Sequence, residues 1–165
     1  MSNQFLVQYI AAANAANANG QYASAVDWCQ RAIGLSPKLP EAWYNLGLAY
    51  RGLGQLDQAM TALKKTDGLT RDNPDAQNSV GLQLLELGAF REAERCLNRA
   101  LFLAPAFVYA YSNLGMLREV QGRFDEAEAA FRKAIQLQPD LAALYVNLSG
   151  LQNLRKRHEL AEVAA

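Results

Sequence analysis

Histidine and cysteine, the side chains that most often carry catalysis and metal binding, are scarce in this chain. Its 165 residues include one histidine, His158, and two cysteines, Cys29 and Cys96. No histidine lies at a position in the repeats that matches a serine, cysteine or aspartate. The sequence therefore does not provide a catalytic triad of nucleophile, base and orienting group. No glycine-rich phosphate loop follows a strand, since no strand is predicted. We therefore expect no enzyme activity, no cofactor and no metal site.

The two cysteines are too far apart to form a recognisable motif. Cys29 lies in the first fifth of the chain, and Cys96 lies beyond its midpoint. This separation fits neither a close metal pair nor a disulfide framework. Each lies among apolar residues of a predicted helix, so we expect both to be buried as small hydrophobic side chains.

The chain also lacks an excess of charge of one sign, and it lacks long apolar runs. Sixteen basic and sixteen acidic residues give a formal net charge of zero, which does not favour nucleic acid or an anionic membrane as a partner. No apolar run approaches the roughly 20 residues that cross a bilayer. The chain starts with MSNQFLVQYI, which lacks the basic region of a secretory signal. We expect a cytoplasmic protein that binds neither nucleic acid nor membranes.

The most informative feature present is a regular repeat. Glycines recur at equal intervals: Gly20, Gly54, Gly88 and Gly122. An alanine stands at the fifth position after each glycine: Ala25, Ala59, Ala93 and Ala127. An aromatic residue or leucine stands at the second position after each glycine: Tyr22, Leu56, Phe90 and Phe124. A period of about 34 residues is typical of one helix-turn-helix unit that is copied and stacked.

Residues 40–73 show how one unit is built. Its first half carries an apolar stripe at helical spacing, formed by Trp43, Leu46, Gly47 and Tyr50. The glycine in this stripe lets a neighbouring helix approach closely, because it has no side chain. Gly54 is the expected C-terminal stop of the first helix. A second apolar stripe begins near Leu56, so each unit is predicted to contain two helices.

The period divides the chain into one array without a separate second domain. We predict full units over residues 6–39, 40–73, 74–107 and 108–141, and a partial fifth unit over 142–165. The fifth unit has Lys156 where the other units have glycine. We expect a solvated turn at residues 155–158, which holds His158, and a second helix inside which the chain ends.

These residues carry a family resemblance. The stretch WYNLGLAY, the AF-x-x-A pattern after Gly88 and a proline at the close of three units (Pro37, Pro105, Pro139) resemble the tetratricopeptide repeat, which has the same period. The resemblance implies an all-α fold, a right-handed α-solenoid of stacked antiparallel helix pairs. It also implies a protein–protein interaction scaffold, with the first helix of each unit lining a concave groove that binds a peptide or partner segment.

One column of this groove is rich in asparagine. It lies at the second position after the Trp/Tyr site of each unit and consists of Ala11, Asn45, Ser79, Asn113 and Asn147. An asparagine amide has two donors and an acceptor, so it can pair with the backbone of an extended peptide of any sequence. The column resembles the asparagine ladder of the tetratricopeptide superhelix in O-linked N-acetylglucosamine transferases. The alternative is that these asparagines are ordinary exposed polar residues.

Neighbouring columns add further candidates for the groove. Asn78 lies beside Ser79, where the ladder is interrupted. Apolar and aromatic candidates that would select partner side chains are Tyr44, Leu48, Leu82, Tyr109 and Met116. The alternative for these residues is packing between adjacent first helices.

A more specific partner is not favoured. Some tetratricopeptide domains hold the acidic tails of heat-shock chaperones with a clamp of cations and asparagines. Asn14 and Asn45 match the asparagines of this clamp, but its basic positions fall on Ile10, Asp75 and Ser79. Without cations a terminal carboxylate gains little. We keep Asn14 as a groove residue and leave the identity of the partner open.

The stretch from Met1 to Val26 contains no charged side chain. A terminal repeat needs a polar outer face for solubility, and Phe5, Val7 and Ile10 would weaken that face here. One hypothesis is therefore a homo-oligomer or architectural subunit that self-associates through its N-terminal end. A further alternative is that the chain is the substrate-recruiting region of a larger enzyme such as a glycosyltransferase.

Overall fold

The computed structural model describes the backbone of residues 2–163 and the side chains of residues 4–158 and 160. Nine helices and no strand are found within residues 2–163. Their bounds are α1 (Ser2–Ala18), α2 (Tyr22–Leu35), α3 (Pro40–Gly52), α4 (Leu56–Leu69), α5 (Pro74–Glu86), α6 (Phe90–Leu103), α7 (Val108–Val120), α8 (Phe124–Leu137) and α9 (Ala142–Val163).

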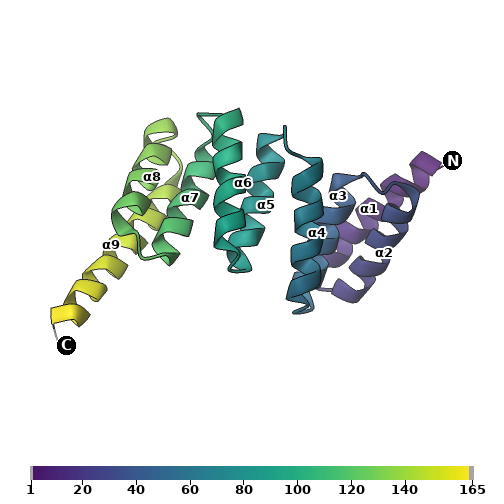
Figure 1. Cartoon of the computed structure of the whole chain (residues 1–165), viewed down its shortest axis with the longest axis horizontal. Helices are drawn as coiled ribbons and strands as arrows, with labels where there is room; N and C mark the ends of the chain where they lie inside the picture. The colour runs from purple at the N-terminus through teal and green to yellow at the C-terminus, as the bar shows by residue number, and fades with distance from the viewer. Residues whose placement is uncertain (1, 164–165) are drawn as a thin grey trace.

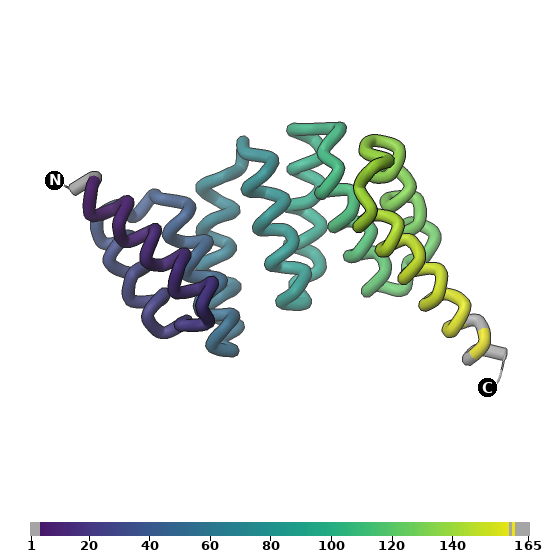
Figure 2. Tube along the Cα trace, turned by 180° about the vertical axis from the view of Figure 1, so that it is seen from behind, coloured from purple at the N-terminus to yellow at the C-terminus, as the bar shows by residue number. Residues whose placement is uncertain are grey.

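The helices form an open array of antiparallel pairs. Each helix packs against the next along the chain, and α1 and α9 lie at opposite ends of the array (Figure 1). The even-numbered helices face the viewer in Figure 1, and the odd-numbered helices face the viewer from behind in Figure 2. The predicted all-α solenoid of stacked helix pairs is therefore confirmed.

The odd-numbered helices form one layer, but their spacing is uneven. The backbones of α1 and α3, of α5 and α7, and of α7 and α9 come close to each other over several residues. The pair α3 and α5 does not reach the same degree of contact, and α4 with α5 is also less extensive than α2 with α3. The array therefore opens in its middle, between α3 and α5.

The repeated glycines end the first helix of each complete unit in the same way. Gly20, Gly54, Gly88 and Gly122 have φ between 72° and 74°, a left-handed conformation that favours glycine. In the turn after α3, the Gln55 amide donates to the Tyr50 carbonyl at 2.9 Å and the Gly54 amide donates to Arg51 at 2.9 Å. This is the Schellman pattern, which satisfies carbonyls at the helix end.

A second set of glycines brings the two helices of a unit together. A Cβ placed on Gly81 of α5 would lie 2.9 Å from the Leu97 side chain of α6. The same holds for Gly47 against Leu63 at 2.9 Å, and for Gly115 against the Phe131 ring at 2.5 Å. The side chain of the second helix thus occupies the space that a larger residue on the first helix would need.

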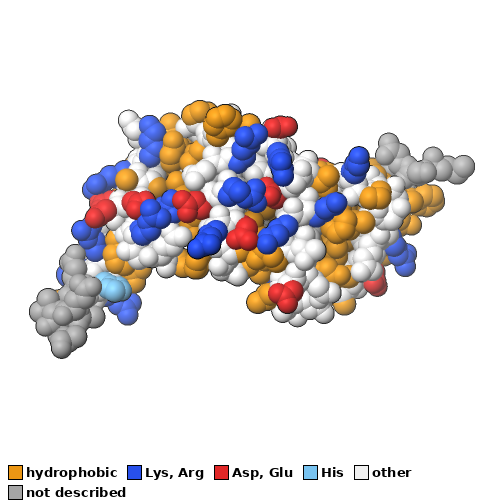
Figure 3. Space-filling model, viewed as in Figure 1, with side chains coloured by type: hydrophobic (Ala, Val, Ile, Leu, Met, Phe, Trp, Pro, Cys, Tyr) orange, Lys and Arg blue, Asp and Glu red, His pale blue; other side chains and the backbone are white. Residues whose placement is uncertain are grey.

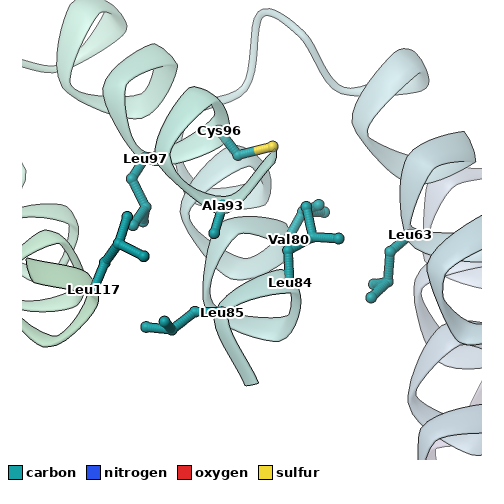
Figure 4. Packing of buried hydrophobic residues seen from close by; sticks show 8 residues of the cluster. All are labelled: Leu63, Val80, Leu84, Leu85, Ala93, Cys96, Leu97 and Leu117. Atoms are coloured by element: carbon teal, nitrogen blue, oxygen red, sulfur yellow. The ribbon is translucent and has the colours of Figure 1, made fainter. Parts of the chain in front are cut away.

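The core runs along the array between the two layers. Alanines at the repeated position, Ala25, Ala59, Ala93 and Ala127, are fully buried. Figure 4 shows the central cluster, in which Val80 and Leu84 of α5 meet Ala93, Cys96 and Leu97 of α6. The cluster reaches Leu63 of α4 on one side and Leu117 of α7 on the other, so each unit is braced by the next.

Both cysteines are free and buried, as predicted. Burial raises the pKa of each thiol to about 12, and for Cys96 the nearby Asp67 carboxylate adds to this effect. Neither thiol is therefore in the thiolate form that a nucleophile needs.

The expected turn at residues 155–158 is wrong. A single helix, α9, runs from Ala142 to Val163 through these residues. Lys156 stands where the other units have a left-handed glycine, and lysine and arginine are good helix formers. Without the glycine, nothing in the local sequence ends the helix, so it continues along the direction of the first helix of the unit.

The turn glycines provide a stability test. Replacing Gly88 with alanine should lower the free energy of unfolding by about 1–2 kcal/mol, because an L-residue is strained at positive φ. A Cβ at Gly88 would meet no atom within 4 Å, so the backbone alone sets this cost. The matched control is Gly150→Ala inside α9, also in open space, which should raise stability by about 0.5–1 kcal/mol. Urea unfolding of both variants measures the change in the free energy of unfolding, which should be negative for Gly88→Ala and positive for Gly150→Ala. Equal changes would contradict this account of the turn.

Candidate functional site

A groove of about 1070 Å³ lies where α3 and α5 separate. It is lined mainly by α1, α3 and α5, with contributions from both ends of α4 and from Tyr22 of α2. Five residues predicted from the sequence line it: Asn14, Tyr44, Asn45, Leu48 and Ser79. The first-helix layer therefore does form a groove, at the N-terminal half of the array.

Two asparagines in this groove have unused hydrogen-bonding capacity. Asn45 is only 6% exposed, and among the described residues its side-chain amide has no hydrogen-bond partner. Asn17 donates from Nδ2 to the Asn45 backbone carbonyl at 3.0 Å, while its own Oδ1 is buried without a partner in the described part of the chain. The unpaired Asn17 Oδ1 is costly because it is buried, whereas the Asn45 amide keeps access to the groove. A ligand that supplies a donor or acceptor would therefore be favourable to both amides.

An ion pair crosses the same groove. Arg51 at the end of α3 donates through Nη1 to the Glu86 carboxylate of α5. Both side chains are partly exposed, so the pair can rearrange when a ligand enters. Burial raises the pKa of the Tyr44 hydroxyl, and the charge of Arg51 opposes that rise, so this hydroxyl stays protonated and can donate.

The predicted asparagine column behaves differently in the C-terminal half. Asn113 of α7 is 8% exposed and donates from Nδ2 to Oδ1 of Asn78 at 2.8 Å. Asn147 of α9 donates to the Ser112 hydroxyl at 3.1 Å. These amides therefore link neighbouring first helices, whereas Asn45 faces the groove without such a partner.

The apolar candidates divide in the same way. Tyr44 and Leu48 are half-buried and line the groove. Leu82 is half-buried outside it, and Tyr109 and Met116 of α7 are 54% and 36% exposed on the first-helix layer. The groove and these exposed residues are thus two neighbouring parts of one layer.

Several groove residues were missed by the sequence reasoning. Asn17, Arg51 and Glu86 line the groove near the ends of α1, α3 and α5. Asn17 and Arg51 are one repeat period apart and so occupy the same place in consecutive units. Extending the column comparison to the last turn of each first helix would have found them.

A buried polar cluster lies beside the groove, at the junction of α4, α5 and α6. Gln77 takes the position that Trp43 and Tyr111 occupy in the adjacent units, and it is 1% exposed. Its Nε2 donates to Oδ1 of Asp67 at 3.2 Å and to the hydroxyl of Thr70, a groove residue, at 3.3 Å. A polar side chain thus replaces an aromatic one at the junction where the array opens.

Asp67 is the charged centre of this cluster. It is 6% exposed, and Arg95 of α6 donates to Oδ2 at 2.6 Å. Burial alone raises the pKa of the Asp67 carboxyl, but the hydrogen bonds from Arg95 and Gln77 outweigh burial and hold the pKa below its usual value of 3.8. Asp67 is therefore ionised at neutral pH and ties α4 to both α5 and α6.

Comparison with known proteins agrees with this architecture. Tetratricopeptide repeat models match residues 16–81 and residues 108–141, which together cover more than half of the chain. The chain belongs to the tetratricopeptide repeat family. A search of curated protein sequences gives no match.

Solved structures share the fold over almost the whole chain. A MamA chain from Desulfovibrio magneticus that starts at residue 41 is 22% identical, with a TM-score of 0.73, over 96% of this chain and 89% of that chain. PilF from Pseudomonas aeruginosa is 18% identical, with a TM-score of 0.79, over 98% of this chain and 73% of PilF. A thermophilic tetratricopeptide repeat protein from Thermus thermophilus is 26% identical, with a TM-score of 0.71, over 85% and 77% of the two chains.

The family and the fold define a protein–protein interaction scaffold in general terms. Among the described residues, no group of three or more His, Cys, Asp or Glu side chains could hold a metal ion. No helix in the described part of the chain is long and apolar enough to cross a membrane.

The polar cluster predicts how stability depends on pH. Because the pKa of Asp67 is lowered by folding, its contribution is complete above the unfolded value of 3.8 and is lost as the pH falls through the folded pKa. Asp67→Asn should lower the free energy of unfolding by about 1–3 kcal/mol near neutral pH, and by less near about pH 3.

The control for this experiment is another aspartate. Asp72→Asn removes an exposed carboxylate that pairs with Arg99 at 3.2 Å, and it should change stability by less than about 1 kcal/mol. Urea unfolding at the two pH values measures both variants. An Asp67→Asn deficit that stays constant with pH would contradict the ionised state assigned to Asp67.

Proposed function

We propose that this protein binds an extended segment of a partner protein in the groove along α1, α3 and α5. The observation that carries the proposal is the pair of amides of Asn17 and Asn45, which line the groove: the Asn17 Oδ1 is buried without a partner, and the Asn45 side chain makes no hydrogen bond among the described residues. A peptide backbone offers an N–H and a carbonyl at every residue, and both complement an amide side chain. The unpaired Oδ1 of Asn17 adds a second acceptor beside it.

The composition of the groove favours a peptide over a small molecule. Amides and hydroxyls alternate with the apolar side chains of Ile10, Tyr44 and Leu48 along helices of three consecutive units. Amides that hold a backbone and apolar surfaces that accept side chains are the combination that peptide recognition uses. We place this activity in the cytoplasm, in keeping with the two free thiols.

The test is a binding measurement with a groove variant. Peptide arrays probed with the purified chain would supply ligands, and calorimetry would give their dissociation constants. The double change Asn14→Ala with Asn45→Ala should weaken binding about tenfold, because two hydrogen bonds of ordinary strength are lost.

The matched control changes two amides on the second helices. Gln58 of α4 and Asn98 of α6 are exposed and lie outside the groove. Gln58→Ala with Asn98→Ala should leave the dissociation constant unchanged, and thermal unfolding would show that both double variants remain folded. Equal affinity of a folded groove variant and the wild type would remove the groove as the binding site.

A second candidate function is self-association through α1. Phe5 and Val7 are 49% and 67% exposed on a helix that carries no charge. Exposed apolar groups on a terminal repeat, where a polar cap is usual, favour contact with a second copy. The rest of α1 is fixed in the array, because Ala13 and Ala16 are buried in the contact with its neighbours.

This candidate has its own test. Sedimentation velocity over a range of concentrations should show a dimer or higher oligomer that is lost in the variant Phe5→Asp with Val7→Asp. The control is Phe102→Asp, which places a charge on another exposed aromatic, 74% accessible at the end of α6. A wild-type chain that remains monomeric at high concentration would exclude this function.

A further inference from the structure

The first helices of the four complete units carry an excess of acidic groups. Helices α1, α3, α5 and α7 contain four acidic residues and two basic ones. The second helices α2, α4, α6 and α8 contain eight of each sign. Figure 3 shows this second-helix face, where Lys and Arg side chains are mixed with Asp and Glu over the centre of the array. The first and second helices of the four complete units therefore differ in charge, although the whole chain has no net charge.

Both basic residues of the first helices α1, α3, α5 and α7 are already paired with carboxylates. Arg51 is paired with Glu86. Arg118 is 8% exposed and forms ion pairs with Glu94 of α6 at 2.5 Å and with Glu126 of α8 at 3.3 Å. Its positive charge therefore neutralises carboxylates of the second helices. No free cation of α3, α5 or α7 is thus left to offset the carboxylates of this layer.

Three carboxylates of the layer have no salt bridge among the described residues: Glu41, Asp75 and Glu119. Glu41 is exposed and lines the groove. Asp75 is exposed at the same place in the next unit, one period further along the chain. Glu119 takes in α7 the place that Arg51 has in α3, and it is half-buried. The unpaired negative charges therefore continue from one unit to the next.

The Glu119 carboxylate is held in an environment that disfavours its charge. Burial raises the pKa of this carboxyl above its usual value, and no cation compensates it in the described part of the chain. The same layer exposes apolar side chains on α7, namely Tyr109, Met116 and Val120, which follows Glu119 in the sequence. A ligand that brings a positive charge would relieve this cost, and its apolar groups would cover the exposed surface.

From this charge pattern we infer that the partner segment is a basic, apolar one: an extended peptide whose lysine or arginine side chains pair with Glu41, Asp75 and Glu119 while alternate apolar side chains cover the layer. This inference rests on the proposed peptide-binding function and specifies its ligand. Complementary charge selects partners and speeds their encounter, while the amides hold the backbone whatever its sequence.

The test uses fluorescein-labelled peptides of equal length that alternate leucine with lysine, glutamine or glutamate. Fluorescence anisotropy with the full chain should give about tenfold tighter binding of the lysine peptide than of the glutamine peptide, and the weakest binding for glutamate. Raising the ionic strength should weaken the binding of the lysine peptide more than that of the other two peptides, because salt screens exposed ion pairs.

A charge variant assigns this preference to the three carboxylates. The combined variant Glu41→Gln, Asp75→Asn and Glu119→Gln should lower the affinity for the lysine peptide to the affinity for the glutamine peptide. The control variant Asp27→Asn, Asp57→Asn and Asp140→Asn changes the net charge equally at exposed sites outside the groove, and it should keep the preference.

The outcomes separate the two claims. Equal binding of all three peptides, abolished by Asn14→Ala with Asn45→Ala, would overturn the basic ligand and leave the groove as a peptide site. A lysine preference that survives the combined change of Glu41, Asp75 and Glu119 would also overturn the inference, because the charge would then act elsewhere. Absence of binding for all three peptides would overturn the inference, whereas the proposed function is overturned only if peptides from the arrays also fail to bind the groove.

Discussion

The close contact between the two helices of each unit is the constraint on which the rest of the structure depends. Gly47, Gly81 and Gly115 leave room for Leu63, Leu97 and Phe131, so the helix pairs of these three units are held at a short distance. Once this distance is fixed, one face of every first helix is committed to its partner. The opposite face of each first helix is then left for other contacts, and stacking brings these faces into a single layer.

The groove lies where this regular stacking is interrupted. The adjacent units place Trp43 and Tyr111 at the junction position, whereas the middle unit has Gln77, which is hydrogen-bonded to Asp67 and Thr70. At the same junction α3 and α5 are less closely packed than the other first-helix pairs. The framework positions thus maintain the array, and a departure from the framework coincides with the place that is suited to a ligand.

Most of the fold could be predicted from the sequence, because the turn glycines and the buried alanines report local geometry that each unit repeats. The end of the array could not: Lys156 allows helix α9 to continue, since a missing glycine removes the stop and helix-forming residues replace it. The column register predicted Asn45 and Leu48 in the groove. It could not show that Asn113 bonds Asn78, because such pairing depends on rotamers and on the spacing between helices.

The nearest-neighbour packing of the array has a consequence for how a bound segment would act. In the described part of the chain, the extensive helix contacts lie within a unit or between adjacent units, so the junction between α4 and α5 is crossed by few other contacts. A ligand lying along α1, α3 and α5 would span that junction. It would contact the units on both sides at once, which otherwise interact only through the few contacts at the junction. A bound ligand would then reduce the flexibility of the array at its centre. The curvature of the array, and with it the relative orientation of its two ends, would depend on whether the groove is occupied.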